Sequence, residues 1–149
     1  MKVEIKRVRE GFGDIPLPEY KSYGAAGMDL SAAVDEDYVI KAGGIGLVPC
    51  GIAFAIPHGF ECQIRSRSGM SLKHGIFALN APGTIDSDYR GEIMIILANF
   101  TADDYTIKRG DRIAQAVFAR HETAEFELVE TLSDTERGSG GFGSTGKEH

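Results

Sequence analysis

The chain has 149 residues, of which 42% are hydrophobic and 26% charged, and its formal net charge at pH 7 is −6. This length and composition predict one soluble domain with a hydrophobic core. The acidic balance argues against broad binding to nucleic acid or to a membrane surface, because both need a basic face that neutralises phosphates.

The N-terminus and the cysteines indicate the cellular compartment. Residues 1–10, MKVEIKRVRE, alternate charged residues with Val and Ile, so they lack the apolar core of a signal peptide. No run of 18 apolar residues occurs, and we expect a cytoplasmic protein. Because Cys50 and Cys62 form no CxxC pair, we expect buried free thiols rather than a disulfide scaffold or a zinc site.

Strand patterns dominate the chain. Alternating or β-branched apolar runs predict strands within residues 2–8, 37–41, 44–57, 60–65, 91–100, 111–119 and 126–130. Turn-forming clusters separate these runs, and only residues 68–75 suit a helix, a short one. The pattern predicts an all-β fold, a distorted jelly roll or β-sandwich over residues 1–136, followed by a flexible, glycine-rich arm over residues 137–149.

Two stretches in the first half of the chain carry polar residues that suit an anion or a metal ion. Asp29 is the single acid in AAGMDLSAA (25–33) and suits either the outer shell of a metal ion or a turn. The stretch RSRSGMSLKHG (65–75) has arginines, serines and a glycine at the start of the expected helix, where free N–H groups and hydroxyls face an anion. A capped helix with solvated charges is the alternative.

The stretch APGTIDSDYRGE, residues 81–92, has the highest density of side chains that could take part in catalysis. Asp86 and Asp88 are two positions apart, so in an extended segment both carboxylates face the same side, away from Tyr89. A carboxylate whose proton affinity is tuned by its surroundings can activate a water molecule. The alternative is a plain hairpin turn, since Asp, Ser and Gly are turn formers.

A polar amide interrupts the last long apolar run, RGDRIAQAVFA (109–119). Gln115 lies there between apolar neighbours, and an amide in that setting needs a hydrogen-bonding partner. The sequence leaves open whether that partner is the backbone or a substrate.

The C-terminal stretch RGSGGFGSTG (137–146) contains a GxGxxG pattern, but too few residues follow it for the helix and strand of a dinucleotide-binding unit. Its uncovered N–H groups, hydroxyls, arginine and single aromatic ring suit a phosphate chain joined to a flat ring. A disordered spacer is the alternative.

The ordered set AGMDL, RSGM, GTIDSDYRGE, RGDRIAQ and RGSGGFGSTG, between residues 25 and 146, resembles the trimeric dUTP diphosphatase (dUTPase) family. The resemblance implies a jelly-roll-like β domain that forms a homotrimer, with active sites shared between subunits. It also implies hydrolysis of dUTP to dUMP and diphosphate, which limits uracil in DNA and supplies dUMP for dTMP synthesis.

Roles for individual residues follow from the resemblance. Asp86 would activate the water that attacks the α-phosphorus, and the Tyr89 ring would lie beneath the deoxyribose and leave no space for a 2′-hydroxyl. The hairpin that reads uracil would contain Asn80, Gly83 and Ile85, and a wrong base would leave polar groups there unpaired.

The remaining substrate-binding residues implied by the resemblance are Arg67, Ser68, Gly69, Gln115, Arg137, Ser139, Phe142, Gly143, Ser144 and Thr145. Among them, Arg137 would pair with the terminal phosphate and Phe142 would stack over uracil. Asp29 would hold Mg²⁺ through water, because magnesium keeps several waters and takes phosphate oxygens as ligands.

Two other functions stay open. A dCTP deaminase would share the trimeric β scaffold, but it would need a glutamate at the pyrimidine C4, for which the sequence has no matching signature. A β-sandwich binding module would use residues 86–89 only as a turn and the tail only as a linker.

Overall fold

The computed structural model describes residues 1–141, so the predicted contacts of Phe142, Gly143, Ser144 and Thr145 lie outside the described part of the chain. Residues 1–141 form eleven strands and one short helix. The strands are β1 (Glu4–Arg7), β2 (Met28–Ser31), β3 (Tyr38–Ile40), β4 (Ile45–Pro49), β5 (Ile52–Ala55), β6 (Phe60–Arg65), β7 (Ile76–Ala78), β8 (Gly83–Ile85), β9 (Met94–Asn99), β10 (Tyr105–Ile107) and β11 (Arg112–Arg120). The helix is α1 (Ser68–His74).

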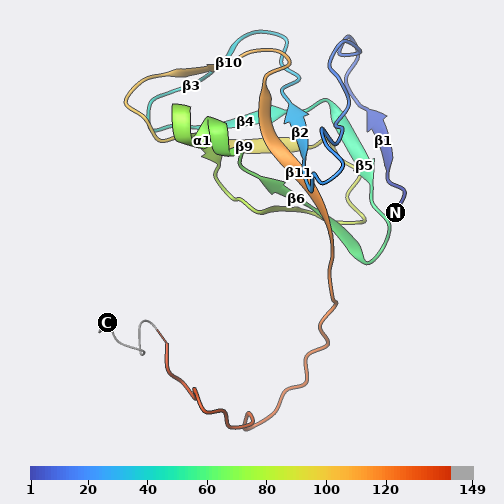
Figure 1. Ribbon diagram of the computed structural model, residues 1–149, viewed down its shortest axis with the longest axis vertical. Coiled ribbons are helices and arrows are strands. Elements are labelled where there is room, and N and C mark those ends of the chain that lie inside the picture. The colour runs from blue at the N-terminus through green and yellow to red at the C-terminus, as the bar shows by residue number, and fades with distance from the viewer. Residues whose placement is uncertain (142–149) are drawn as a thin grey trace.

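The strands form antiparallel sheets (Figure 1). A four-stranded sheet has the order β2-β11-β6-β8, and a three-stranded sheet has the order β4-β9-β7. Two further pairs join β1 to β5 and β3 to β10. The expectation of a mostly β chain with one short helix near residues 68–75 is confirmed.

Strand boundaries differ from the expected runs for local reasons. The run over residues 44–57 forms two strands, because Gly51 takes a left-handed φ of 69° and turns the chain between β4 and β5. The strands β2, β7, β8 and β10 were not expected, since three or four residues are too few to establish an alternation. The strand expected over residues 126–130 is wrong, because no partner strand of the same chain pairs with it.

The core lies between the inward faces of these sheets. Its largest fully buried side chains are Leu30, Ile40, Val48, Cys62, Ile76, Ile93, Ile95, Leu97, Asn99, Ile107 and Ile113. Cys50 and Cys62 are buried free thiols, as expected. Burial raises the pKa of both thiols to about 12, so both stay protonated and unreactive at neutral pH.

Helix α1 ends at a residue that must be glycine. Gly75 has a φ of 62°, and a Cβ there would lie 2.6 Å from Thr101 Cγ2. The Gly75 N–H donates to Ser71 O at 3.0 Å and closes the last turn. The chain enters β7 directly after this stop, and at the other end of α1 only two residues separate its start from the end of β6.

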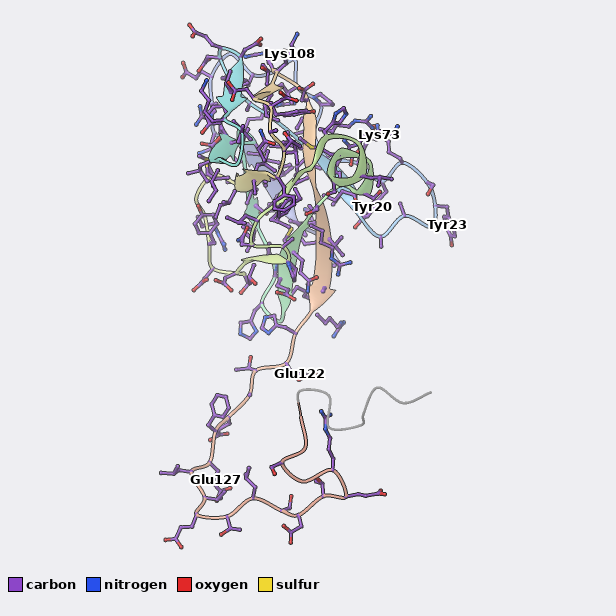
Figure 2. All side chains as sticks on the ribbon, turned by 90° about the vertical axis from the view of Figure 1, so that its left-hand side faces the viewer. Tyr20, Tyr23, Lys73, Lys108, Glu122 and Glu127 are labelled. Carbon is purple, nitrogen blue, oxygen red and sulfur yellow. The ribbon has the colours of Figure 1, made fainter. Side chains whose placement is uncertain are left out.

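The sheets end at Arg120, and the chain then leaves the β body (Figure 1). Residues 121–141 form no strand or helix, and Phe126 and Leu128 are 96% and 101% exposed. Figure 2 shows Glu122 and Glu127 on this extension, away from the body. In the described residues no helix is long and apolar enough to cross a membrane.

Candidate functional site

Asp29 is the centre of a charged cluster between β2, β11 and the start of α1. Its Oδ1 accepts hydrogen bonds from Arg67 Nε at 3.0 Å and from Gln115 Nε2 at 3.3 Å. Its Oδ2 accepts from Arg112 Nη1 at 3.1 Å. The structure therefore brings together three residues that the sequence singled out separately, and adds Arg112, for which the sequence suggested no individual role.

The strand register explains why these groups meet. Gln115 of β11 lies opposite Asp29 of β2 on one side and opposite Arg65 of β6 on the other. The Gln115 amide thus donates to a carboxylate of a neighbouring strand. The sequence had left only the backbone and a substrate as possible partners. Arg67 reaches the same carboxylate because it follows β6 by two residues, just before α1.

The cluster carries more positive than negative charge. Two guanidinium groups, of Arg67 and Arg112, share the Asp29 carboxylate, whose side chain is only 13% exposed. Arg67 Nη1 also donates to Arg112 O at 2.9 Å, which fixes the plane of the Arg67 guanidinium. Preoriented guanidinium groups with an uncompensated charge suit a phosphate ligand.

The same cluster does not fit a directly ligated magnesium ion. Both Asp29 oxygens already accept hydrogen bonds from cationic or amide groups. Within residues 1–141, no group of three or more His, Cys, Asp or Glu side chains lies close enough to hold a metal. The donor set is compatible only with a carboxylate that accepts hydrogen bonds from water on a metal that phosphate oxygens hold.

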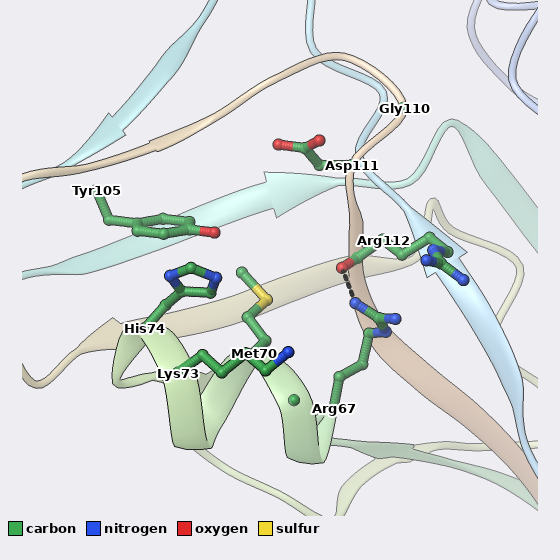
Figure 3. A pocket seen from close by; sticks show the side chains of 9 residues that line it. Arg67, Met70, Lys73, His74, Tyr105, Gly110, Asp111 and Arg112 are labelled. Atoms are coloured by element: carbon green, nitrogen blue, oxygen red, sulfur yellow. Dashed lines mark hydrogen bonds between the residues drawn. The ribbon is translucent and has the colours of Figure 1, made fainter.

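Ser68 and Gly69 are the first residues of α1 and are exposed. A Cβ at Gly69 would meet nothing within 4 Å, so the space beside this turn is open to a ligand. Beyond them, a pocket of about 400 Å³ opens next to Arg67 and Arg112 (Figure 3).

The second candidate group is the turn segment over residues 86–92 between β8 and β9, here named the hairpin although β8 pairs with β6 and not with β9. Asp86 and Tyr89 lie in its turn, with Tyr89 N donating to Asp86 O at 3.2 Å. Together with Ile85, Glu92 and neighbouring side chains they line a pocket of about 150 Å³. The turn that the sequence offered as an alternative is real, and it presents the Asp86 carboxylate at an exposed position.

Asn80 and Gly83 are in close contact beside this hairpin. Gly83 is buried, and a Cβ there would lie 3.0 Å from Asn80 Nδ2 and 3.4 Å from Ile64 Cβ. A side chain at residue 83 would therefore displace the Asn80 amide. These two residues and Ile85, predicted to read the base, occupy one short segment next to Asp86.

Glu92 anchors the hairpin, and the sequence analysis missed it. Its Oε1 accepts hydrogen bonds from Arg9 Nε at 2.6 Å and from Gly51 N at 2.8 Å, and this contact raises the pKa of Arg9. The Tyr89 hydroxyl donates to the Glu92 carbonyl at 3.0 Å. The only signal in the sequence was a charged residue at the entrance of an apolar strand, which is common at strand ends.

The two groups lie far apart within one chain. Asp29 is on β2 and the hairpin follows β8, and these strands are the opposite edges of the four-stranded sheet. Three strand intervals of about 4.8 Å separate the edges by roughly 14 Å. The pocket beside Arg67 and Arg112 and the pocket beside Asp86 and Tyr89 share no lining residue.

Arg137 and Ser139 lie on the extension, away from both groups. Arg137 Nε donates to Gly140 O at 2.8 Å, within its own turn. The proposed contacts of Arg137 and Ser139 with phosphates stay predictions, as do those of the tail residues beyond 141.

Fold and site together define a mostly β protein with an arginine-rich cluster around Asp29 and a separate carboxylate-bearing turn after β8. Comparison with known proteins specifies the class further. A family model for dUTPase matches residues 13–146. The deoxyuridine 5'-triphosphate nucleotidohydrolase of Anaplasma marginale (strain St. Maries) is 54% identical over 146 residues, which cover 98% of this chain and 99% of that one.

Solved structures agree with this match. The dUTPase of Staphylococcus bacteriophage 80alpha, solved with dUPNHPP, has a TM-score of 0.86 at 27% identity, and the match covers 97% of this chain and 98% of that one. A dUTPase mutant from phage phi11 of S. aureus, solved with a structural Mg(II) ion, has a TM-score of 0.79 at 23% identity, covering 90% and 100% of the two chains. The chain belongs to the dUTPase family.

Proposed function

We propose that this chain hydrolyses dUTP to dUMP and diphosphate, which limits uracil incorporation into DNA and supplies dUMP for dTMP synthesis. The observation that carries the proposal is the 54% sequence identity, over 98% of this chain, to a deoxyuridine triphosphate nucleotidohydrolase. It is supported by the pocket that Asp86 and Tyr89 share.

Asp86 is the proposed base. Its exposed carboxylate takes a proton from a water molecule, and the water oxygen forms a bond to the α-phosphorus. The bond from that phosphorus to the oxygen bridging to the β-phosphorus breaks, and diphosphate leaves with the electron pair. The Tyr89 ring packs under the deoxyribose, and the Asn80, Gly83 and Ile85 segment reads the uracil edge.

Arg67, Ser68, Gly69 and Gln115 are the proposed phosphate contacts, with Asp29 holding Arg67 in place. Asp29 would accept a hydrogen bond from water on a magnesium ion bound to the triphosphate, and such an ion would neutralise phosphate charge. In the phage phi11 dUTPase a structural Mg(II) ion is coordinated. Asp29 can both orient Arg67 and accept a hydrogen bond from metal-bound water without losing both of its hydrogen bonds to guanidinium groups.

The distance between the two groups supports a shared active site. A dUTP molecule needs its α-phosphate near Asp86 and its phosphate chain near Arg67. In one chain Asp86 follows β8 beside the start of the paired strand β6, whereas Arg67 follows the end of β6. We therefore propose that the hairpin of one copy meets the Asp29 cluster of another in a homotrimer, the state the sequence resemblance implies. Rotational symmetry repeats such a contact and closes the ring.

An apolar outer face supports assembly as well. In the β4-β9-β7 sheet, Leu47 lies opposite Ile96, Ile45 opposite Ala98, and Phe77 opposite Ala98 on its other side. These residues share one face, and Ile45 and Leu47 are 65% and 50% exposed. The opposite face already packs in the core, so the sheet is apolar on both sides. Exposure of one apolar face to water is unfavourable, so we expect another surface to cover it.

The extension beyond Arg120 is the proposed link to a neighbouring copy. Its exposed apolar residues, Phe126, Leu128 and Leu132, find no cover on their own β body. Their packing on another subunit would carry the glycine-rich arm, residues 137–149, over that subunit's ligand. In this proposal the β domain comprises residues 1–136 and the arm the rest.

An assay of dUTP, UTP, dTTP and dCTP, with and without Mg²⁺, tests the proposed activity. Release of diphosphate from dUTP alone is the expected result. Ammonia release from dCTP would instead indicate a deaminase, and no turnover of any nucleotide would leave a binding module.

Asp86→Asn tests the base. The variant should fold and bind nucleotide but turn over about 10²- to 10⁴-fold more slowly, the usual contribution of a general base. Asp88→Asn, two positions along the same turn, is the matched control and should retain most of the activity. Turnover by Asp86→Asn at the wild-type rate would remove Asp86 from this role.

A further inference from the structure

We infer that the pocket between α1 and the segment joining β10 to β11 is a diphosphate-binding site, in which Lys73 holds the two terminal phosphates before cleavage and the diphosphate product afterwards. The inference rests on the proposed hydrolysis of dUTP. It adds a residue and a site to the phosphate contacts described above.

The pocket has a cationic end and a hydroxyl-bearing wall (Figure 3). Its volume of about 400 Å³ lies within the range of roughly 300–1,000 Å³ that small-molecule sites have. In Figure 3 the Lys73 amino group points along α1 toward Arg67, and the Tyr105 hydroxyl points into the same space. The residues lining the pocket are Arg67, Gly69, Met70, Lys73, His74, Tyr105, Gly110, Asp111 and Arg112.

The Lys73 ammonium group has no charged partner in the described residues. Arg67 and Arg112, by contrast, share Asp29. The acid on the pocket wall, Asp111, accepts a hydrogen bond from the Lys108 backbone N–H at 2.8 Å. Three cationic side chains thus outnumber the two carboxylates in and behind the pocket, within a chain whose net charge is −6.

Tyr105 adds a neutral donor beside the lysine. Partial burial, together with the nearby Asp111 carboxylate, raises the pKa of its hydroxyl, so the group stays protonated. The His74 ring packs against it, with ring centroids 5.4 Å apart, and holds the phenol in place. A hydroxyl donor and an ammonium donor on one wall suit the several oxygens of a diphosphate.

The position of the pocket matches the direction of the reaction. Arg67 belongs both to the Asp29 cluster and to the pocket lining. A triphosphate held at Arg67 has its terminal groups next to Lys73, and the leaving diphosphate gains negative charge there. Binding that strengthens as the leaving group departs stabilises the transition state more than the substrate.

Calorimetric titration of the full-length protein with inorganic diphosphate, with and without Mg²⁺, tests the site. Lys73→Gln should raise the dissociation constant about tenfold, the effect of one charge-assisted hydrogen bond. Tyr105→Phe, which keeps the ring, should raise it by a smaller factor. Lys108→Gln is the matched control, because Lys108 is exposed and lies outside the pocket lining, and it should leave binding unchanged.

A second readout is product inhibition of dUTP hydrolysis. In Lys73→Gln, inhibition by diphosphate should weaken about tenfold, while inhibition by dUMP stays unchanged. Equal diphosphate affinity of wild type and Lys73→Gln in both buffers overturns the site, as does absence of diphosphate binding to the wild type. The titration needs no turnover, so Lys73-dependent binding without dUTP hydrolysis would refute the proposed function and keep the site.

Discussion

At the scale of residues, Asp29 shows what a sequence leaves undetermined. The sequence suggested either a metal-shell acid or a turn acid. The structure places Asp29 on β2, where its carboxylate bridges two arginines and an amide, and the metal-shell role stays a proposal. Its partners Arg67 and Arg112 are 38 and 83 positions away along the chain. No local pattern encodes such a contact, because the register of β2 on β11 creates it.

Glu92 gives a prediction at the same scale. Glu92→Ala removes the acceptor of Arg9 and of the Gly51 N–H, so the free energy of unfolding should fall by about 1.5–3 kcal/mol. The loosened hairpin should also lose part of the dUTP preference over UTP, since Tyr89 is tied to the Glu92 carbonyl. Urea unfolding and the ratio of kcat/KM for the two nucleotides measure these effects.

Two controls separate the anchor from a general loss of charge. Glu92→Gln keeps an acceptor oxygen and should lose less, and Glu122→Ala on the exposed extension should change neither quantity. An unchanged nucleotide preference in Glu92→Ala would mean that the hairpin holds its shape without this contact.

At the scale of elements, the length of a strand decides whether its sequence predicts it. The runs that became β6, β9 and β11 have six to nine residues and a clear apolar pattern. The edge strand β8 has three residues and a buried glycine, so nothing in its sequence distinguishes it from a loop. Residues 126–130 read as a strand by composition, but a strand also needs a neighbour to pair with.

The C-terminal arm is predicted to act on catalysis and not on folding. A chain that ends at Glu136 should keep the melting temperature of the full-length protein, since no buried core residue lies beyond Ala116 in the described chain. It should hydrolyse dUTP at a small fraction of the wild-type rate. Circular dichroism melting and a diphosphate-release assay check both points.

The opposite results are equally informative. An unfolded truncated chain would show that the arm is a structural strand. Full activity would show that the arm does not cover the ligand.

At the scale of the whole molecule, the outer face of the β4-β9-β7 sheet is predicted to be buried between copies. Leu47→Glu places a charge where an apolar contact is expected and should convert the proposed trimer to monomers that remain folded. Burial of one leucine contributes about 1.5–3 kcal/mol, and each trimer would lose this at every contact. Sedimentation velocity measures the mass.

Val39→Glu is the matched control. Val39 is 45% exposed on β3, outside the three-stranded sheet, and its substitution should leave the assembly intact. A trimeric Leu47→Glu protein would show that another surface joins the copies.

The separation of Asp86 from the arginine cluster within one chain has a genetic consequence. A chain carrying Asp86→Asn keeps its arginine cluster, and a chain carrying Arg67→Ala keeps its hairpin carboxylate, so each homotrimer should be inactive while a mixture is not. Unfolding and refolding the two proteins together in equal amounts should restore about a quarter of the wild-type activity, the share of interfaces that pair two intact halves. Two defective alleles in one cell would then complement each other.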